Sequence, residues 1–369
     1  MREKRFILTL CGTSVLTNIA RNQEERKLIR KCTNVKDKGD IPKKDREELE
    51  RLLNYSKHKL SEADGFEATK MSAELNALNK LCSGFPKNRQ DIHMLLCSDT
   101  WLGHEVAKGL SRWINTQLAT EAINIQRQTD LQTQDVELFQ NSLKDLIKKL
   151  YEELPSYSGS GHKVIFNLTG GFKPVQGFLQ SIAHFFADEC VYIFESSSVL
   201  LTMPRLPVEL ATPNSIKKHI NFFRNIDLQP KNPIPSDIPD TLLLVSGREC
   251  TLSAWGDLIW NEAKKALYNE RILDSPNENK IRYGKQFRRD INGIEQDRIF
   301  ILNNRLDQLN RYLYDKKNLC SLDFKKLRGN PTPPSTHEFD AWADGAAYRV
   351  FGHFETDTFV LDKLAKGLH

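Results

Sequence analysis

Long apolar runs, paired cysteines and low-complexity tracts are missing from this chain of 369 residues. No stretch approaches the roughly 18 consecutive apolar residues that a membrane-spanning helix needs, and the charged first residues do not have the pattern of a signal peptide. The seven cysteines are scattered and none belongs to a Cys-x-x-Cys pair, so neither a zinc ribbon nor a disulfide scaffold is expected. These absences predict a cytoplasmic globular protein without a metal site.

The first 205 residues contain short β-branched apolar runs that alternate with stretches of helical spacing. This alternation predicts an α/β fold in which helices cover both faces of a parallel sheet. The last two runs lie so close together that we expect a hairpin at the sheet edge. The charged segments 40–60 and 68–81 predict surface helices inserted after the first strand. The expected strands cover residues 6–10, 92–97, 122–125, 164–168, 191–195 and 199–203.

The remainder of the chain changes character twice. Residues 206–280 include a proline-rich stretch, 229–239, that cannot hold a helix, and we expect them to form a connector region. On either side of that stretch the sequence predicts a helix over 215–223, a strand over 242–245 and a helix over 255–268. Residues 281–369 combine two helical segments with a run of strands, which predicts a small α+β domain. Its first part, 282–328, has 12 Lys and Arg against 6 Asp and Glu, a net charge of +6. Such an excess favours a polyanionic partner, although solvated helix faces give similar counts.

Two glycine-containing motifs follow predicted strands of the first domain. Gly12, Thr13 and Ser14 come directly after the first strand, where free backbone N–H groups and hydroxyls can meet a ligand. A plain helix N-cap uses the same residue types, so this interpretation also stays open. The second motif, Asn167-Leu-Thr-Gly-Gly-Phe-Lys, places tight-turn glycines and a cation before a helix whose N-terminus favours phosphate.

The spacing of these motifs differs from that of the common nucleotide folds. The second motif has neither the Gly-x-x-x-x-Gly-Lys-Ser/Thr spacing of a P-loop nor the Gly-x-Gly-x-x-Gly spacing of a dinucleotide fold. Because a Ser-Asp-Thr segment follows a third strand, the three segments together predict a nucleotide-facing site of another type. Its candidate residues are Gly12, Thr13, Ser14, Ser98, Asn167, Thr169, Gly170, Gly171 and Lys173.

Gly-Thr-Ser after an opening strand and Asn-x-Thr-Gly-Gly-x-Lys after a later one resemble the CARF domains of type III CRISPR ancillary proteins. The resemblance covers residues 1–205 and implies a Rossmann-like homodimeric sensor of cyclic oligoadenylate, with no other cofactor. Cyclic tetra-adenylate is the most common ligand of such domains, and its two-fold symmetry suits a dimer. Whether the sensor also degrades the ligand is left open. The resemblance implies ligand contacts from Thr13, Ser14, Asn167, Thr169, Gly170, Gly171 and Lys173.

The C-terminal domain carries cations on a loop and on a later strand. Alternate residues of a strand share a face, so Arg349 and His353 point one way and Tyr348 the other. The loop cations can converge on the Arg349 face, but a solvated loop beside an exposed strand explains the same pattern. These loop cations are Lys325, Lys326 and Arg328.

The order of a short strand, two helices, Lys-Lys-Leu-x-Gly and strands with Tyr-Arg-Val resembles RelE-type toxins over residues 281–369. The resemblance implies a metal-independent mRNA interferase acting on translating ribosomes, in which cations stabilise the scissile phosphate while the 2′-OH attacks. Acidic Glu338 and Asp340 stand where a basic residue is common, so His337 takes that role or one in acid–base catalysis. The implied catalytic residues are Lys325, Lys326, Arg328, His337, Arg349 and His353.

These observations favour a signal-gated ribonuclease over other nucleases. The Arg-x4–6-His motif of a HEPN nuclease is not found, because the nearest match, Arg328 to His337, is too wide and contains prolines. The C-terminal strands also lack the Asp and Glu-x-Lys pattern of restriction-type nucleases. The alternative is a nucleotide-sensing transcription regulator that binds DNA through a small winged helix within residues 206–280.

Overall fold

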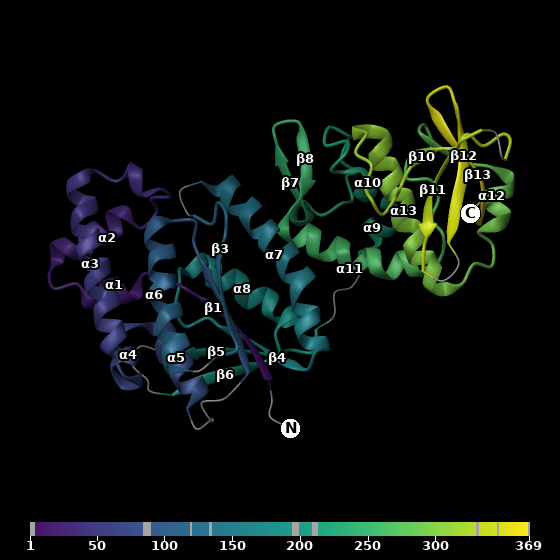
Figure 1. Cartoon of the computed structure of the whole chain (residues 1–369). Helices are drawn as coiled ribbons and strands as arrows, with labels where there is room; N and C mark the ends of the chain where they lie inside the picture. Colours follow the sequence, from purple (N-terminus) through teal and green to yellow (C-terminus); the bar gives the residue numbers. More distant parts are fainter. Residues whose placement is uncertain are drawn as a thin grey trace. The chain divides into compact units, whose positions relative to one another are not determined.

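The computed structural model describes residues 4–83, 90–118, 120–132, 135–193, 199–208, 213–329, 332–344 and 347–367. It divides the chain into two compact units, residues 1–209 and 210–369. Within the described ranges, no helix combines the length and the apolar character needed to cross a membrane. Figure 1 shows the elements in chain order.

A six-stranded sheet of order β3-β2-β1-β4-β5-β6 forms the centre of the first unit. All neighbouring pairs from β3 to β5 are parallel, whereas β6 runs antiparallel to β5 at the edge. The predicted α/β class and the predicted edge hairpin are therefore confirmed. The strands are β1 (Lys4–Leu10), β2 (Asp91–Cys97), β3 (Ala122–Arg127), β4 (His162–Asn167), β5 (Glu189–Ile193) and β6 (Leu200–Pro204).

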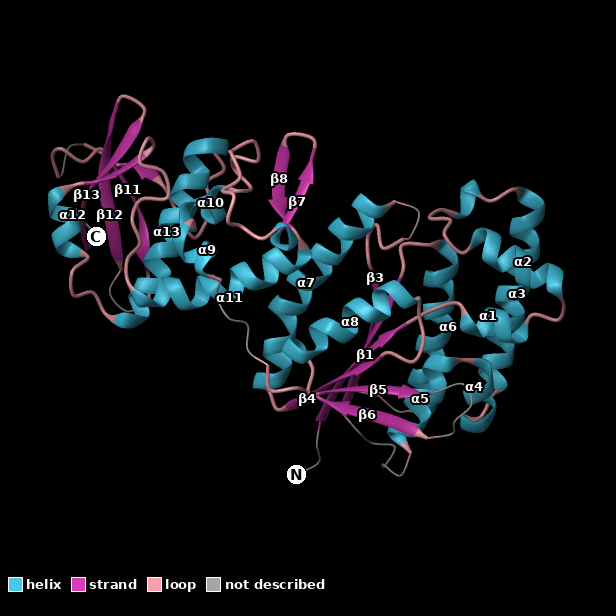
Figure 2. Ribbon diagram, turned by 180° about the vertical axis from the view of Figure 1, so that it is seen from behind, coloured by secondary structure: helices cyan, strands magenta, loops and turns pink. Residues whose placement is uncertain are grey.

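Helices lie on both faces of this sheet (Figure 2). Helices α7 and α8 pack against β4 on one face, and α5 and α6 pack against the strands on the other. The segment between β1 and β2 forms α1 to α5, of which α1 and α2 were not predicted. The helices are α1 (Ser14–Ile19), α2 (Gln23–Cys32), α3 (Lys43–Glu62), α4 (Gly65–Met71), α5 (Ala73–Cys82), α6 (Trp101–Gln117), α7 (Val136–Gly159) and α8 (Lys173–Phe186), with a 3-10 turn η1 (Lys38–Asp40).

The strand order reverses between β1 and β4, which are parallel neighbours. From β1 the chain continues to β2 and β3 on one side, and from β4 it continues to β5 on the other. The loops that leave such a pair diverge to opposite faces and open a crevice at the carboxyl ends of the strands, where open α/β sheets bind ligands. Both glycine-containing motifs lie at this switch point.

A fully buried histidine, His93, occupies the middle of β2, and neither of its ring nitrogens has a hydrogen-bond partner among the described residues. Burial lowers the pKa of His93 to about 4, from an ordinary value near 6.5. As the pH falls below 6.5, His93 becomes protonated in the unfolded chain but stays neutral in the folded chain. The free energy of unfolding therefore decreases as the pH decreases.

We expect the wild-type chain to lose about 2 kcal/mol more than a His93→Leu variant between pH 6.5 and 4.5, because one pKa unit corresponds to 1.36 kcal/mol. Urea unfolding across this range measures the difference. His58, whose side chain is 66% exposed, provides the control His58→Gln, which should retain the wild-type pH dependence. Parallel curves for wild type and His93→Leu would contradict the assignment.

The first part of the second unit contains the secondary structure expected on either side of the prolines: the helix predicted over 215–223 is present as two short helices, and the strand and helix predicted over 242–245 and 255–268 are also present. Residues 213–280, within the expected connector, form two short helices, a hairpin and a long helix with a shared apolar core. This core extends onto Phe300, and the buried Arg224 side chain donates to Asp307 at 2.7 Å. The elements are α9 (Asn214–Lys218), α10 (Ile220–Asn225), η2 (Asp240–Leu242), β7 (Leu243–Ser246), β8 (Glu249–Leu252) and α11 (Ala254–Glu270).

The second part of this unit is a five-stranded sheet of order β10-β11-β12-β13-β9, with one face against α13. The pairs are antiparallel except β13–β9, which is parallel. Its two helices and strands agree with the α+β pattern predicted from the sequence. The elements are β9 (Ile281–Tyr283), α12 (Lys285–Asp290), α13 (Gln296–Asp315), β10 (Lys325–Lys326), β11 (His337–Trp342), β12 (Tyr348–Glu355) and β13 (Thr358–Lys366).

Candidate functional site

The loops after β1 and β4 touch each other at the switch point. A Cβ atom added to Gly12 would lie 3.0 Å from the backbone of Gly171. Gly171 itself has φ +85°, and a Cβ there would overlap the Leu10 side chain. Only glycine tolerates both conditions, so this close approach accounts for the glycines in the two motifs.

The side chain of Glu74, at the start of α5, lies between these two loops. Its carboxylate accepts hydrogen bonds from the Gly12 N–H at 2.8 Å and from the Ser14 hydroxyl at 2.7 Å. A third bond comes from the Ser72 hydroxyl at 2.6 Å. Glu74 is only 1% exposed, and a Cβ on Gly170 would overlap its carboxyl group. The N–H and hydroxyl groups predicted to be free are thus already bound to a carboxylate.

Asn167 and Thr169, both predicted to contact the ligand, are turned into the protein. Asn167 is fully buried, and its side-chain amide donates to the main-chain oxygen of Glu74 at 3.2 Å. Its Oδ1 atom accepts from the Thr169 N–H at 3.3 Å. The Thr169 hydroxyl is buried and has no hydrogen-bond partner within the described part of the chain. In this conformation Asn167 shapes the β4 loop instead of facing solvent.

Three other candidates lie around this crevice with different surroundings. Lys173 is the first residue of α8 and is exposed. Thr13 occupies the N-cap position of α1, but its side chain makes no capping hydrogen bond. Ser98 follows β2, and its hydroxyl lies 2.9 Å from that of Thr100, which caps α6. Lys173 and Thr13 therefore remain accessible to a ligand, whereas the Ser98 hydroxyl is hydrogen-bonded to the threonine that caps α6.

In the second unit, Lys325 and Arg349 lie on one face of the sheet, together with acidic residues. Register pairs Lys325 with Glu338 and Arg349 with Asp340. Arg349 contacts Glu338 at 3.1 Å and Asp340 at 3.0 Å, and its third partner, Asp323, lies at 3.3 Å. Asp323 also binds Lys325 at 2.5 Å. Of the three loop cations predicted to converge on the Arg349 face, only Lys325 lies there, and carboxylates hold both Lys325 and Arg349.

This charge cluster carries two cations and three carboxylates, a net charge of −1. The Arg349 side chain is 15% exposed, and both of its terminal nitrogens are in ion pairs. The hydrogen bond from Lys325, reinforced by Arg349, lowers the pKa of Asp323, so this acid stays ionised. Arg349 therefore cannot offer its guanidinium fork to a phosphate unless these carboxylates are displaced.

His353 lies farther along β12, on the same face as Arg349, and is paired with an acid that the sequence did not single out. Its Nδ1 atom lies 2.9 Å from Asp362, at the position where β13 carries one residue more than β12. Asp362 also accepts from the hydroxyl of buried Ser335 at 2.7 Å. The contact with Asp362 fixes the orientation of the imidazole. The other ring nitrogen, Nε2, lies 3.4 Å from the carboxylate of Glu355, whose side chain is half exposed.

The remaining predicted catalytic residues lie elsewhere. The His337 ring stacks on Phe324 with centroids 5.3 Å apart and meets Phe354 edge-on, so it belongs to an aromatic cluster. Burial, with a smaller contribution from Lys326, lowers its pKa. Lys326 is the register partner of His337, so it shares that face and not the Arg349 face. Arg328 is exposed beyond the end of β10.

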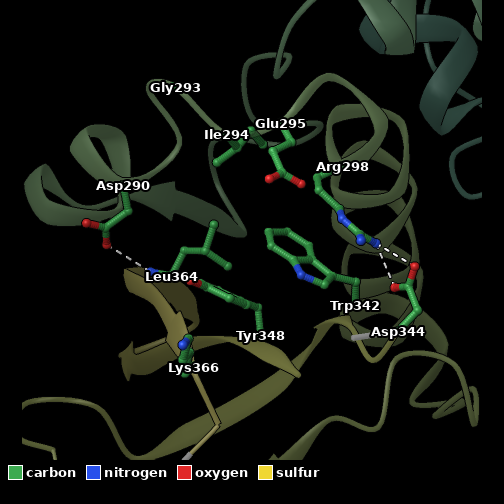
Figure 3. A pocket seen from close by; sticks show the side chains of 10 residues that line it. All are labelled: Asp290, Gly293, Ile294, Glu295, Arg298, Trp342, Asp344, Tyr348, Leu364 and Lys366. Atoms are coloured by element: carbon green, nitrogen blue, oxygen red, sulfur yellow. Dashed lines mark hydrogen bonds and ion pairs between the residues drawn. The ribbon is translucent and has the colours of Figure 1, made fainter. Parts of the chain in front are cut away.

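A cavity of about 530 Å³ opens beside Trp342, at the end of β11, and Tyr348, at the start of β12 (Figure 3). Trp342 and Tyr348 stack in it with ring centroids 5.0 Å apart, and the Arg298 guanidinium lies 5.6 Å from the Trp342 ring centroid. Arg298 also binds Asp344 at 2.6 Å. None of the six predicted catalytic residues lines this cavity.

Residues 69–206 match the model of a family described as CRISPR-associated protein (Cas_APE2256). The match supports a CRISPR-associated protein. It runs from within α4 to the end of β6, so it includes Glu74 and the β4 loop but not β1. No curated protein matches the sequence.

Proposed function

We propose that this chain is a ribonuclease of type III CRISPR defence that cyclic oligoadenylate activates. The observation that carries the proposal is the meeting of the Gly12 and Gly170–Gly171 loops at the switch point between β1 and β4. Such a crevice binds nucleotides in other open α/β sheets. The match of residues 69–206 to a CRISPR-associated family supports the same biological setting.

For the ligand we propose cyclic tetra-adenylate, bound by a homodimer of first units. Lys173 and Thr13 would contact the phosphates, because they border the crevice and are accessible. A ring with two-fold symmetry fits two identical sites across a dimer axis. Edge strand β6 and its flanks offer apolar surface for a second copy. Its exposed residues are Val199, Leu201, Met203, Leu206 and Val208, each 39–60% exposed.

For the effector we propose a RelE-type module that cleaves mRNA on translating ribosomes. The face of its sheet that carries Arg349 presents His353, held by Asp362, and the cations Lys325 and Arg349, whose carboxylate partners the substrate phosphate would have to displace. In the proposed step His353 removes the proton from the 2′-OH. The 2′-oxygen then attacks the phosphorus, the bond between the phosphorus and the 5′-oxygen breaks, and that oxygen takes a proton from water, which gives a 2′,3′-cyclic phosphate and a 5′-hydroxyl.

Binding of radiolabelled cyclic oligoadenylates of several ring sizes to the full chain tests the sensor. We expect Lys173→Ala to weaken binding about tenfold or more with an unchanged melting temperature, because one charged hydrogen bond contributes roughly 1.5–3 kcal/mol. Lys148, which is exposed on α7, provides the control Lys148→Ala. Equal affinity of wild type and Lys173→Ala would remove this loop from the site, and absence of binding by every ring would refute the sensor proposal.

A further inference from the structure

One residue, Glu74, accepts hydrogen bonds from donor groups of both glycine-containing motifs. The Gly12 N–H and the Ser14 hydroxyl bind its carboxylate, and the Asn167 amide binds its main-chain oxygen. These three donors come from the ends of β1 and β4, the two strands that border the switch point. These three donor groups of the crevice are therefore bound to the protein itself.

The position that Glu74 fills has the chemistry of an anion site. Three hydrogen bonds of 2.6–2.8 Å converge on its two carboxylate oxygens, and these lengths are typical of charge-assisted bonds. Gly170 carries no side chain at the point where the carboxyl group passes over the β4 loop. A phosphate presents the same negative oxygens, so it would find the same donors in the same place.

A phosphate and the Glu74 carboxylate cannot both occupy this position, because like charges repel strongly at a site that excludes water. We propose that Glu74 is a resident competitor of the ligand phosphate, which must displace it to reach Gly12 and Ser14. This inference rests on the proposed function only for the identity of the ligand. The anion chemistry of the position follows from the hydrogen bonds alone.

The local structure permits such a displacement. Ser72 has extended backbone between two helices, since it is both the C-cap of α4 and the N-cap of α5. Its hydroxyl binds Glu74 and accepts from the Leu75 N–H at 3.3 Å. A change at this single non-helical residue moves the start of α5 without breaking either helix. Ligand binding would thus be coupled to the α4–α5 segment, residues 65–82.

Glu74→Gln tests the proposal because it removes the charge and keeps the shape. The amide oxygen can still accept from the Gly12 N–H, and the amide NH2 can donate to the Ser14 hydroxyl. We expect Glu74→Gln to bind cyclic tetra-adenylate about tenfold more tightly, since a neutral hydrogen bond is roughly half as strong as a charge-assisted one. Inorganic pyrophosphate should raise the melting temperature of this variant more than that of the wild type. Glu67→Gln, an exposed position on α4, is the matched control and should behave as wild type.

The outcomes separate this proposal from the proposed function. Tighter ring binding by Glu74→Gln supports both, and equal ring binding by the variant and the wild type overturns the competitor role while the sensor proposal stands. If no ring binds but pyrophosphate stabilises Glu74→Gln alone, the competitor role stands and the cyclic ligand is wrong. If neither the ring nor pyrophosphate binds wild type and Glu74→Gln differently, the competitor role is overturned.

A second measurement covers the case in which Glu74→Gln does not fold. Hydrogen exchange of the wild-type chain is followed with and without cyclic tetra-adenylate, and with and without pyrophosphate. Faster exchange of residues 65–82 in the presence of either anion supports displacement of Glu74. Unchanged or slower exchange in that segment, with both anions at high concentration, overturns it.

Discussion

Arg349→Ala is expected to destabilise the second unit by about 3 kcal/mol and to lower RNA cleavage by about 10²-fold or more. The substitution leaves three carboxylates facing one another, and the Glu338 side chain is only 5% exposed. Removal of one partner from a buried charge pair costs about 3–5 kcal/mol, and the partial exposure of Asp323 and Asp340 reduces this value. The loss of cleavage corresponds to one donor that stabilises the transition state.

Urea unfolding measures the first effect, and toeprinting of mRNA in a translation extract with cyclic tetra-adenylate measures the second. The double variant Arg349→Ala/Glu338→Gln separates the two, because it removes the most buried of the uncompensated charges. It should recover most of the lost stability but none of the lost cleavage. Recovery of cleavage together with stability would show that Arg349 supports the fold only. Wild-type cleavage by Arg349→Ala would place the active site elsewhere.

The sequence predicted the strands of the first sheet because each is an apolar run of the right length beside a turn. In the second sheet it missed β10, whose two residues, Lys325 and Lys326, were expected in a loop. It also predicted the edge hairpin, because only three residues separate the apolar runs 191–195 and 199–203, too few for the helix that connects parallel strands. Helices α1 and α2 were missed, although Asn22 caps α2 with a side-chain bond to Glu25. In residues 206–280 the sequence predicted the helices and the strand on either side of the prolines, but it did not predict that Trp260 and Tyr268 belong to an apolar core shared by these elements.

The two loops at the switch point were predictable, but the residue that lies between them, Glu74, was not. Gly12 and Gly170–Gly171 can be recognised from the sequence alone, because two loops whose backbones lie this close require glycine whatever the ligand. Glu74 lies 60 residues from Ser14 and 93 from Asn167 in the chain, and no spacing rule connects positions so far apart. For Arg349 a signal did exist. Glu338 and Asp340 alternate along β11, the strand that precedes the Arg349 strand in the chain and pairs with it, and this pattern places acids opposite the cation.

His353→Ala is expected to reduce cleavage by about 10²–10⁴-fold, the usual contribution of a positioned general base. Asp362→Asn should reduce it less, because the asparagine still positions the ring but no longer stabilises the imidazolium that forms. Both variants should bind cyclic tetra-adenylate as the wild type does, since His353 and Asp362 belong to the second unit. The assay is cleavage of mRNA on translating ribosomes, with the 2′,3′-cyclic phosphate end identified on the product.

His337→Phe is the matched control for this prediction, because both histidines were candidates from the sequence. Phenylalanine preserves the ring stack on Phe324 and removes the two nitrogens, so cleavage should stay within a few-fold of wild type. A substrate with 2′-deoxyribose at the scissile position should resist every variant, because it lacks the attacking hydroxyl. If His337→Phe loses cleavage and His353→Ala keeps it, the general base belongs to the aromatic cluster around His337. The face of the sheet that carries Arg349 and His353 is then not the active site.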